Sequence, residues 1–418
     1  MPPHPAFPLP DSRWLLKSKA VFVDLHSDLP FWTVKNGIAR VYPPLERDIR
    51  CDALVIGGGI TGALVSRALV REGADCVVID RRDIGQGSTS ASTALLQYEI
   101  DTPLHKLIDQ AGRQKAERAY RLGVEAVDEL AVIAKGQCGF ARRPSLLVTR
   151  RASDVPGLRR EFEARKRAKL PVRWLERREL DGNYGIPRAA AIRSTAAAEC
   201  DPYRLTHHLF HRCERQGLRI FDRTEAIHYQ PHTTGVRVRT NRGVTIGARK
   251  IFFATGYETQ SFVPRRIVKL ASTYAFVSEP SNNGAWKDRA LVWETGESYL
   301  YSRTTTDGRV LVGGEDDFVL NPARRDAQLA LKTRKLLARF RTLLPGCAPE
   351  PAFCWAGTFG YTKDGLAYVG SLPSFPQAYF ALGFGGNGIT FSVTAARILT
   401  NLFLGRKDAD AAIFRFDR

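Results

Sequence analysis

Short apolar runs alternate along this chain with glycine-rich turns and with longer stretches of helical spacing. The runs with the composition of buried strands lie at 54–56, 76–79 and 250–254. The stretches with helical spacing lie at 103–135, 153–168 and 326–344. Another helix is expected after Asp201, which would cap it with Pro202 at the first helical position. Strands alternating with helices predict an α/β protein.

The region between residues 262 and 350 has a different pattern, with short strand-like runs and few helices. These runs lie at 275–277, 291–293, 299–303 and 309–314. A hairpin is predicted just upstream, from the period-two alternation over 236–238 and 243–246. Residues 1–46, rich in proline and aromatics, are expected to be a lead segment draped on the surface. The sequence therefore predicts a second, sheet-rich domain.

Three glycines follow the first strand at the spacing of the dinucleotide-binding fingerprint. The first permits a tight turn, the second lets the backbone approach a pyrophosphate, and the third lets the helix pack on the strand. The next strand ends in an acid placed to bind ribose hydroxyls, 18 residues after the last glycine. The predicted contacts are Gly57, Gly59, Ile60, Thr61, Gly62, Asp80 and Arg81.

Three further segments of small residues extend this predicted cofactor site. One is the turn at Thr255 and Gly256, which ends the buried strand 250–254. The hydroxyl-rich stretch 88–93 would form a second cradle, although it also suits a plain loop before a helix. The turn at 383–388 opens a C-terminal helix, whose positive end would suit the pyrimidine edge of a flavin. A nicotinamide cofactor needs only the first fingerprint, so FAD is favoured. The predicted contacts are Ser88, Thr89, Ser92, Thr93, Thr255, Gly256, Gly385, Gly386, Asn387, Gly388, Ile389 and Thr390.

Composition fits a soluble enzyme of two domains, with 418 residues, 44% hydrophobic and 25% charged. Seven cysteines without a CxxC motif suggest reduced thiols and a cytoplasmic location. No apolar run is long enough to span a membrane, and the first residues do not resemble a signal peptide. His207 and His211 have metal-ligand spacing on one helix, but without a third ligand they are expected to be surface histidines, and no metal is predicted.

The net charge of +19 has several readings. The basic residues are spread along the chain, which favours solvated surfaces, with one denser region from Arg142 to Arg178. An anionic substrate or contact with an anionic membrane surface stays open. No basic-aromatic module or zinc cluster supports nucleic acid as a partner.

Four motifs occur in a fixed order: the fingerprint, Gly87–Thr93, Ala254–Tyr257 and Leu382–Thr390. Together with Arg303–Gly314, they resemble the D-amino-acid oxidase superfamily of FAD-dependent oxidoreductases, which includes glycine and sarcosine oxidases and γ-glutamylputrescine oxidase. The resemblance covers residues 50 to 405, nearly the whole chain. It implies a Rossmann-like FAD-binding domain and a discontinuous substrate domain built on a mostly antiparallel sheet.

The resemblance also divides the chain. A lead segment covers 1–46. The FAD-binding domain is expected at 47–139, 193–261 and 353–418, and the substrate domain at 140–192 and 262–352.

The chemistry implied is oxidation of a C–H bond next to an amine, by hydride transfer to flavin N5, with an amino acid or small amine as substrate. Tyr299, Tyr301 and Arg303 are two residues apart, so a strand would project them from one face, where Arg303 could clamp a carboxylate. Gln97 and Tyr98 are further candidates, and Lys269 or Arg266 would replace Arg303 if it is a surface residue. An aromatic wall is expected from Trp293, Trp355 and Tyr361, unless they pack in the core.

Two departures from related sarcosine oxidases stand out. Their oxygen-activating lysine has no counterpart in Arg309–Gly313, and Cys354 lies too early to attach flavin. FAD is therefore expected to bind noncovalently, and the electron acceptor is left open between O2, a quinone and a carrier. Two other functions are also considered: a dehydrogenase of a hydroxy acid or polyol phosphate, and a flavoprotein acting on tRNA.

Overall fold

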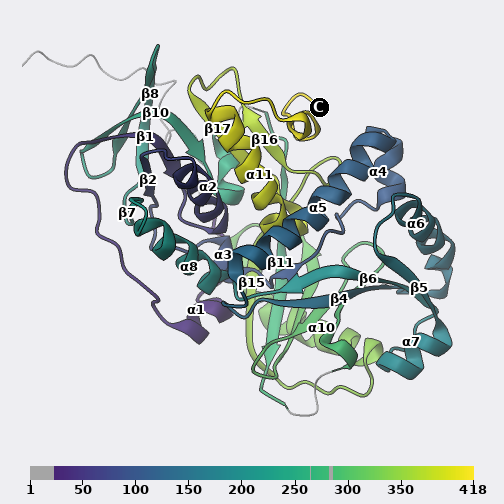
Figure 1. The fold of residues 1–418 in the computed structure, drawn as a ribbon. Helices are drawn as coiled ribbons and strands as arrows, with labels where there is room; N and C mark the ends of the chain where they lie inside the picture. Colours follow the sequence, from purple (N-terminus) through teal and green to yellow (C-terminus); the bar gives the residue numbers. More distant parts are fainter. Residues whose placement is uncertain (1–22, 264, 282–285) are drawn as a thin grey trace, which may run out of the picture.

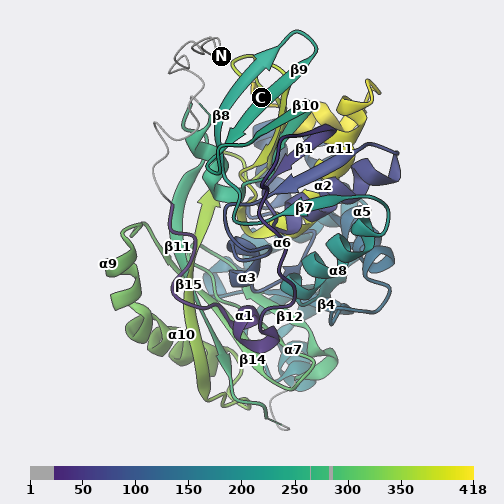
Figure 2. The same ribbon diagram turned by 90° about the vertical axis from the view of Figure 1, so that its left-hand side faces the viewer.

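The computed structural model describes residues 23–263, 265–281 and 286–418. Its chain builds two sheets that meet along one cavity (Figure 1). The first sheet, with helices α2, α8 and α11, lies at the upper left of Figure 1, and the second lies below it. Turning the molecule by 90° shows β11 and β15 of the second sheet running up toward the first (Figure 2).

The first sheet has a parallel centre, in the order β17, β10, β1, β2 and β7. Its central strands are apolar and buried, as expected for parallel strands covered on both faces. An antiparallel β16 pairs with β17, and β8 and β9 extend β10 as a meander. The strands are β1 (Ile49–Ile56), β2 (Cys76–Ile79), β7 (Arg219–Phe221), β8 (Ala226–His232), β9 (Gly235–Thr240), β10 (Thr245–Phe253), β16 (Tyr368–Ser371) and β17 (Ala378–Leu382).

The second sheet is antiparallel except where β12 pairs with β4. Its order is β15, β11, β14, β13, β12, β4, β6 and β3, with β5 beside β6. The strands are β3 (Leu95–Leu96), β4 (Ala141–Val148), β5 (Val172–Glu176), β6 (Ala190–Glu199), β11 (Lys269–Ser278), β12 (Leu291–Glu294), β13 (Tyr301–Thr304), β14 (Val310–Asp317) and β15 (Pro351–Tyr361).

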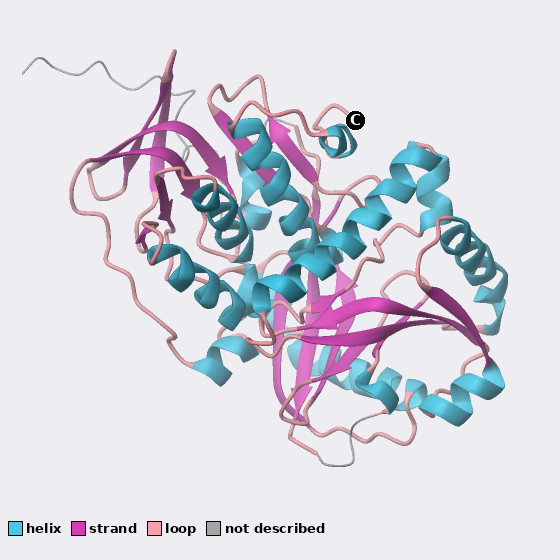
Figure 3. Ribbon diagram, in the orientation of Figure 1, coloured by secondary structure: helices cyan, strands magenta, loops and turns pink. Residues whose placement is uncertain are grey.

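Helices pack on both sheets, and α5 crosses the middle of the molecule between them (Figure 3). In the first sheet's layer, α2 packs against α8 and α11, and α5 packs against α11. On the second sheet, α10 packs on β11, β14 and β15. The helices are α1 (Phe31–Asn36), α2 (Ile60–Arg71), α3 (Ser88–Ala91), α4 (Leu104–Ala111), α5 (Arg113–Ala134), α6 (Val155–Arg167), α7 (Arg177–Tyr184), α8 (Pro202–Glu214), α9 (Pro322–Ala327), α10 (Leu329–Leu343) and α11 (Gly388–Phe403).

The predicted α/β class and the antiparallel second sheet are confirmed. Asp201 caps α8 as expected, because its Oδ1 accepts a hydrogen bond from the Arg204 amide at 2.9 Å. The helix expected over 103–135 is two helices, since Gly112 interrupts it at φ 82°.

Three expectations need correction. Strand β6 runs across the expected boundary at 192/193 and β15 across 352/353, and both pair entirely within the second sheet. The lead segment is not merely draped on the surface, because Phe31 and Trp32 of α1 are buried against Trp355. His207 is buried against the Tyr203 ring at 4.5 Å, and burial lowers its pKa to about 4. The expectation of no signal peptide concerns residues outside the described ranges.

Candidate active site

A cavity of about 770 Å³ lies where the two sheets meet. Its volume is in the range of ligand and cofactor sites, about 300–1,000 Å³. The predicted cofactor contacts line it except Gly62, and so do Tyr299, Tyr301 and Gln97 predicted for the substrate, whereas Arg303 does not. Their positions define two ends: a dinucleotide end at the β1–α2 turn, and a substrate end between Gln97, Trp293 and Tyr299.

Each glycine of the β1–α2 turn lacks room for a side chain, or leaves space open, for a different structural reason. Gly57 has φ +115°, and a Cβ there would lie 2.4 Å from the Ala254 carbonyl oxygen. A Cβ on Gly62 would lie 1.8 Å from the Gly57 carbonyl oxygen. At Gly59 the only atom near a Cβ is Thr89 Oγ1, at 3.0 Å. Gly59 is therefore the glycine whose missing side chain leaves open space at the cavity.

Asp80 lines the dinucleotide end beside this turn. Its Oδ2 accepts from the Gly58 amide at 2.6 Å, and its Oδ1 accepts from the Arg82 amide at 2.8 Å. Burial raises the pKa of Asp80, and the two amides oppose that shift. Arg81 and Arg82 both bond Glu258. A carboxylate accepts about four hydrogen bonds, so Asp80 retains lone pairs for ribose hydroxyls.

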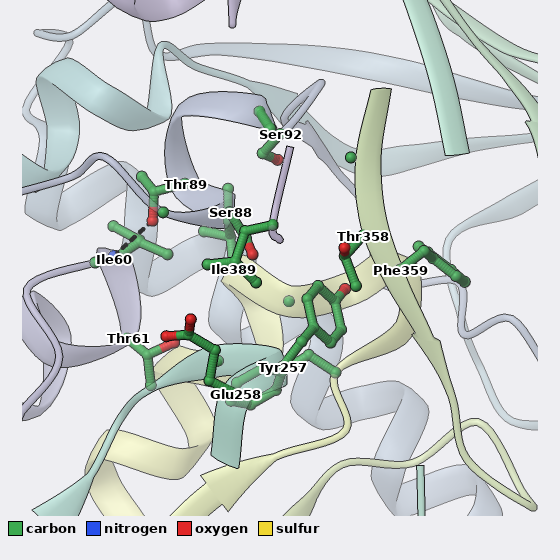
Figure 4. Close-up of a pocket in the computed structure, with 18 of the residues that line it drawn as sticks. Ile60, Thr61, Ser88, Thr89, Ser92, Tyr257, Glu258, Thr358, Phe359 and Ile389 are labelled. Carbon is green, nitrogen blue, oxygen red and sulfur yellow. Dashed lines mark hydrogen bonds between the residues drawn. The ribbon is translucent and has the colours of Figure 1, made fainter. Parts of the chain in front are cut away.

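The hydroxyl-rich stretch forms α3 and the loop after it. Thr89 Oγ1 accepts from the Ile60 amide at 3.0 Å, so α3 is tied to the start of α2 (Figure 4). Two indoles hold the same segment from the other side: Trp32 Nε1 donates to the Ser92 carbonyl at 2.7 Å, and Trp355 Nε1 to the Ala91 carbonyl at 2.9 Å. The buried Ser88 Oγ has no protein partner, although Ser88 lines the cavity.

The C-terminal glycine turn is fastened to the segment that follows β3. Asn387 Nδ2 donates to the carbonyl oxygens of Gln97 at 3.0 Å and Glu99 at 2.9 Å. Thr390 Oγ1 also donates to the Gln97 carbonyl, at 3.3 Å. These bonds bring the N-terminus of α11 to the cavity wall, and its contact with the pyrimidine edge of a flavin stays a prediction.

The segment from Gln97 to Asp101 alternates between core and cavity. Tyr98 and Ile100 are buried in the hydrophobic core, whereas Gln97, Glu99 and Asp101 line the cavity. This alternation is visible in the sequence as a period-two pattern. Of the two candidates in this segment, Gln97 lines the cavity, whereas the expectation for Tyr98 is wrong because its side chain is buried in the core. Asp101 is therefore a site residue that sequence reasoning missed.

Asp101 stands at the substrate end with two hydrogen-bond donors. The Tyr299 hydroxyl donates to its Oδ1 at 3.1 Å, and the Gly386 amide donates to its Oδ2 at 2.9 Å. Burial raises the pKa of this carboxyl, while the hydrogen bonds from Gly386 and Tyr299 lower it. Aromatic rings surround the group: Tyr299 lies 5.8 Å from Trp293 and 5.9 Å from Tyr301 between ring centroids.

Arg303 does not face the cavity, so its expected role as a carboxylate clamp is wrong. Its side chain is 2% exposed, and its guanidinium donates to the Thr93 carbonyl at 2.7 Å, Glu199 at 3.2 Å and the Cys200 carbonyl at 2.9 Å. Tyr301 and Arg303 share a strand face, but the loop after α3 and the end of β6 cover the position of Arg303.

The other basic candidates also lie elsewhere. Lys269 and Arg266 are exposed and do not line the cavity. Within the described ranges, the basic side chains of the cavity wall are Arg81 and Arg82, both at the dinucleotide end. Of the aromatic candidates, Trp293 and Trp355 line the cavity, while the Tyr361 hydroxyl bonds Asp316 at 2.8 Å.

Three other observations concern metal ligands, cysteines and membrane-spanning helices in the described part of the chain. It contains no group of three or more side chains able to hold a metal ion. No cysteine lines the cavity, and Cys354 is exposed on β15. No helix in the described ranges is long and apolar enough to cross a membrane.

The residues present fit FAD. Open space at Gly59, the start of α2, an acid at the end of β2 and an unpartnered Ser88 hydroxyl suit a dinucleotide. The cavity continues past the N-terminus of α11 to an aromatic and polar end, where a substrate would meet a flavin ring. This combination defines an oxidoreductase of the FAD-dependent class.

The comparisons with known proteins agree with this class. The family model described as DAO, FAD dependent oxidoreductase, matches residues 52–402, and the chain belongs to this family. It is 25% identical to the glycine oxidase of Bacillus licheniformis, over 85% of this chain and 94% of that one. It is also 25% identical to the gamma-glutamylputrescine oxidoreductase of Escherichia coli, over 91% and 89%. The crystal structure of glycine oxidase from Geobacillus kaustophilus has a TM-score of 0.75 at 19% identity, over 88% of this chain and 99% of that one.

Proposed function

We propose that this enzyme oxidises a C–H bond next to the nitrogen of an amino acid or small amine. The observation that carries the proposal is the charge of the substrate end. Asp101, two phenols and an indole line it, and the basic side chains of the described cavity wall lie at the dinucleotide end. A hydroxy acid or polyol phosphate would bring its own negative charge beside Asp101 without a cation to neutralise it.

Bound FAD would accept the hydride of this C–H bond at N5, leaving the substrate as an imine that water can hydrolyse. The protein residues position the substrate, because Trp293, Tyr299 and Tyr301 present a wall of rings against one side of the cavity. Such positioning supplies much of the rate. An amine that arrives as an ammonium first gives up one proton, to Asp101 or to solvent, so that the lone pair of the neutral nitrogen can stabilise the carbon that loses hydride. The indoles of Trp32 and Trp355 fix the backbone of Ser92 and Ala91, which line the cavity where FAD would bind.

A panel of substrates tests the proposal. The purified enzyme is expected to be yellow and to release FAD on acid precipitation. Under anaerobic conditions, an amine or amino acid should bleach the flavin absorbance, whereas hydroxy acids and polyol phosphates should not. Bleaching by the hydroxy acids or polyol phosphates alone would overturn the proposal. Reoxidation of the bleached enzyme with O2 and with a soluble quinone then identifies the electron acceptor.

A further inference from the structure

We infer that Asp101 binds the ammonium group of the substrate, so that the preferred substrate is a cationic amine that carries no carboxylate at its oxidised end. This inference rests on the proposed function and narrows its substrate class. In this role Asp101 selects ligands by charge, because its carboxylate attracts a cation and repels an anion in a partly desolvated cavity.

The geometry leaves Asp101 able to bind such a group. Its two oxygens accept one hydrogen bond each, from Tyr299 and Gly386, and a carboxylate has about four acceptor positions. Both donors are neutral, so they fix the orientation of the carboxylate without neutralising its charge. A Cβ on Gly385 would lie 2.3 Å from Oδ2, which shows how closely the backbone of this turn holds the carboxylate. An ammonium with three donors complements the remaining lone pairs.

Among the residues that the structure describes, the charged neighbours of Asp101 include no cation. Asp316 is the other acid that acts on it electrostatically, and the Tyr361 hydroxyl donates to Asp316 Oδ2 at 2.8 Å. Glu99 lines the same cavity, but Arg165 lies 3.6 Å from its Oε1 and offsets its charge. The expected cation, Arg303, is bonded elsewhere. A substrate carboxylate at this end would therefore meet acids and neutral donors, without an arginine or lysine from the described cavity wall.

The aromatic residues favour the same class of ligand. Trp293 and Tyr299 line the cavity with their rings 5.8 Å apart and tilted by 71°. Ring faces attract cations, with tryptophan the strongest of the aromatic side chains. A cationic amine would thus gain from Asp101 and from these rings, whereas an anion would gain from neither.

Two ligands of nearly equal shape separate charge from size. tert-Butylammonium and pivalate both carry a tert-butyl group, and tert-butylamine has no C–H bond next to nitrogen that could be oxidised. Isothermal titration calorimetry of the holoenzyme with each ligand measures binding without chemistry. The wild type is expected to bind tert-butylammonium about 10- to 100-fold more tightly than pivalate, as for a hydrogen bond to a charged group. Equal or tighter binding of pivalate would overturn the inference.

Asp101→Asn tests the residue itself. The asparagine can still accept from the Gly386 amide and donate to the Tyr299 hydroxyl oxygen, so the local packing should persist. This variant should lose the preference for tert-butylammonium while keeping its FAD content and melting temperature. Asp316→Asn is the matched control: it removes a nearby acid that does not line the cavity, and should keep most of the preference. Loss of the preference in Asp316→Asn but not in Asp101→Asn would contradict the assignment.

A substrate pair separates failure of this inference from failure of the proposed function. Norvaline is butylamine with a carboxylate on the carbon next to nitrogen. Butylamine is expected to reduce the flavin at a concentration at least about tenfold lower than either enantiomer of norvaline. If norvaline is instead the better substrate, the proposed function survives and the inference falls, with the unpartnered Gln97 Nε2 and Trp293 Nε1 as the donors to examine for a carboxylate. If only hydroxy acids reduce the flavin, both fall.

Discussion

The two ends of the cavity are built in different ways. The dinucleotide end consists mainly of backbone and small side chains from short consecutive segments, such as Gly57–Thr61 and Ser88–Thr93. The substrate end consists of large side chains from distant parts of the chain: Asp101, Trp293 and Tyr299 converge there with the Gly386 amide. A backbone cradle suits any protein that binds the same cofactor, whereas converging side chains determine which substrate enters. The end that shows the family is thus not the end that distinguishes its members.

The largest expected effect comes from filling the backbone cradle. Gly59→Val should abolish FAD binding, because the valine side chain would occupy the open space next to the start of α2. The fold should survive, since Gly59 has φ −82° and ψ −172°, which valine adopts readily, and only Thr89 Oγ1 lies near the new Cβ. The measurements are flavin absorbance of the purified variant and its far-UV circular dichroism.

Gly182→Ala serves as the control, because Gly182 lies exposed in α7 with no atom near a new Cβ. It should retain full FAD content. A Gly59→Val enzyme that is as yellow as the wild type would show that the predicted fingerprint does not hold the cofactor.

The same contrast explains what could be predicted from the sequence. The turn, the strand before it and the acid at Asp80 follow from local rules, since backbone atoms close to Gly57 and Gly62 leave no room for a side chain. Tyr299 and Tyr301 both line the cavity, although β13 begins only at Tyr301, and the strand rule does not say what covers Arg303, the third residue of the expected face. Arg303 meets Glu199, 104 residues away, and such a pairing depends on tertiary packing that periodicity does not encode. Asp101 was within reach, because residues 96–101 alternate, but its donors come from positions 299 and 386.

Arg303 provides the second prediction, on stability rather than on substrate. Arg303→Met should lower the free energy of unfolding by about 3–5 kcal/mol, the usual cost of leaving one partner of a buried ion pair without the other. The value is expected near the lower limit, because Arg143 still pairs with Glu199 at 2.9 Å. Arg143→Met removes the more exposed partner and should cost less. Denaturant unfolding measures the loss of stability in the two variants. A Michaelis constant for the amine that rises only in Arg303→Met would show that Arg303 does act on the substrate.

Asp80 provides the third prediction, an intermediate effect at the dinucleotide end. Asp80→Ala should weaken FAD binding by about 1.5–3 kcal/mol, because hydrogen bonds from ribose hydroxyls to a charged acceptor are lost. The Gly58 and Arg82 amides also lose their acceptor, so the turn should loosen. Equilibrium titration of the apoprotein with FAD measures the change. Asp75→Ala, which removes an exposed acid just before β2, should leave FAD affinity unchanged. Equal losses of FAD affinity in the two variants would show that Asp80 does not bind the ribose hydroxyls.

The smallest expected effect is a shift in pH dependence at the substrate end, in Tyr299→Phe. Burial raises the pKa of Asp101, and the Tyr299 hydroxyl opposes this by donating to the charged carboxylate. Loss of that hydrogen bond, worth about 1 kcal/mol, should raise the pKa of Asp101 further. Other groups that act on this carboxyl or are acted on by it are Asp316, Tyr257 and Tyr301.

The direction in which the pH dependence of binding shifts follows because the ammonium binds only the ionised form of Asp101. tert-Butylammonium binds the ionised carboxylate and stays protonated from about pH 5 to 9, so its affinity is lost as the pH falls through the pKa of Asp101. In Tyr299→Phe this acid limb should therefore move to higher pH, with little change in affinity above it. Tyr301→Phe is the matched control, because the Tyr301 hydroxyl meets Thr273 Oγ1 at 3.5 Å and does not bond Asp101. Calorimetric titrations across this pH range measure both variants. The loss of affinity at low pH could instead move to lower pH in Tyr299→Phe, or by the same amount in Tyr299→Phe and Tyr301→Phe. Either result would show that the substrate ammonium does not contact Asp101.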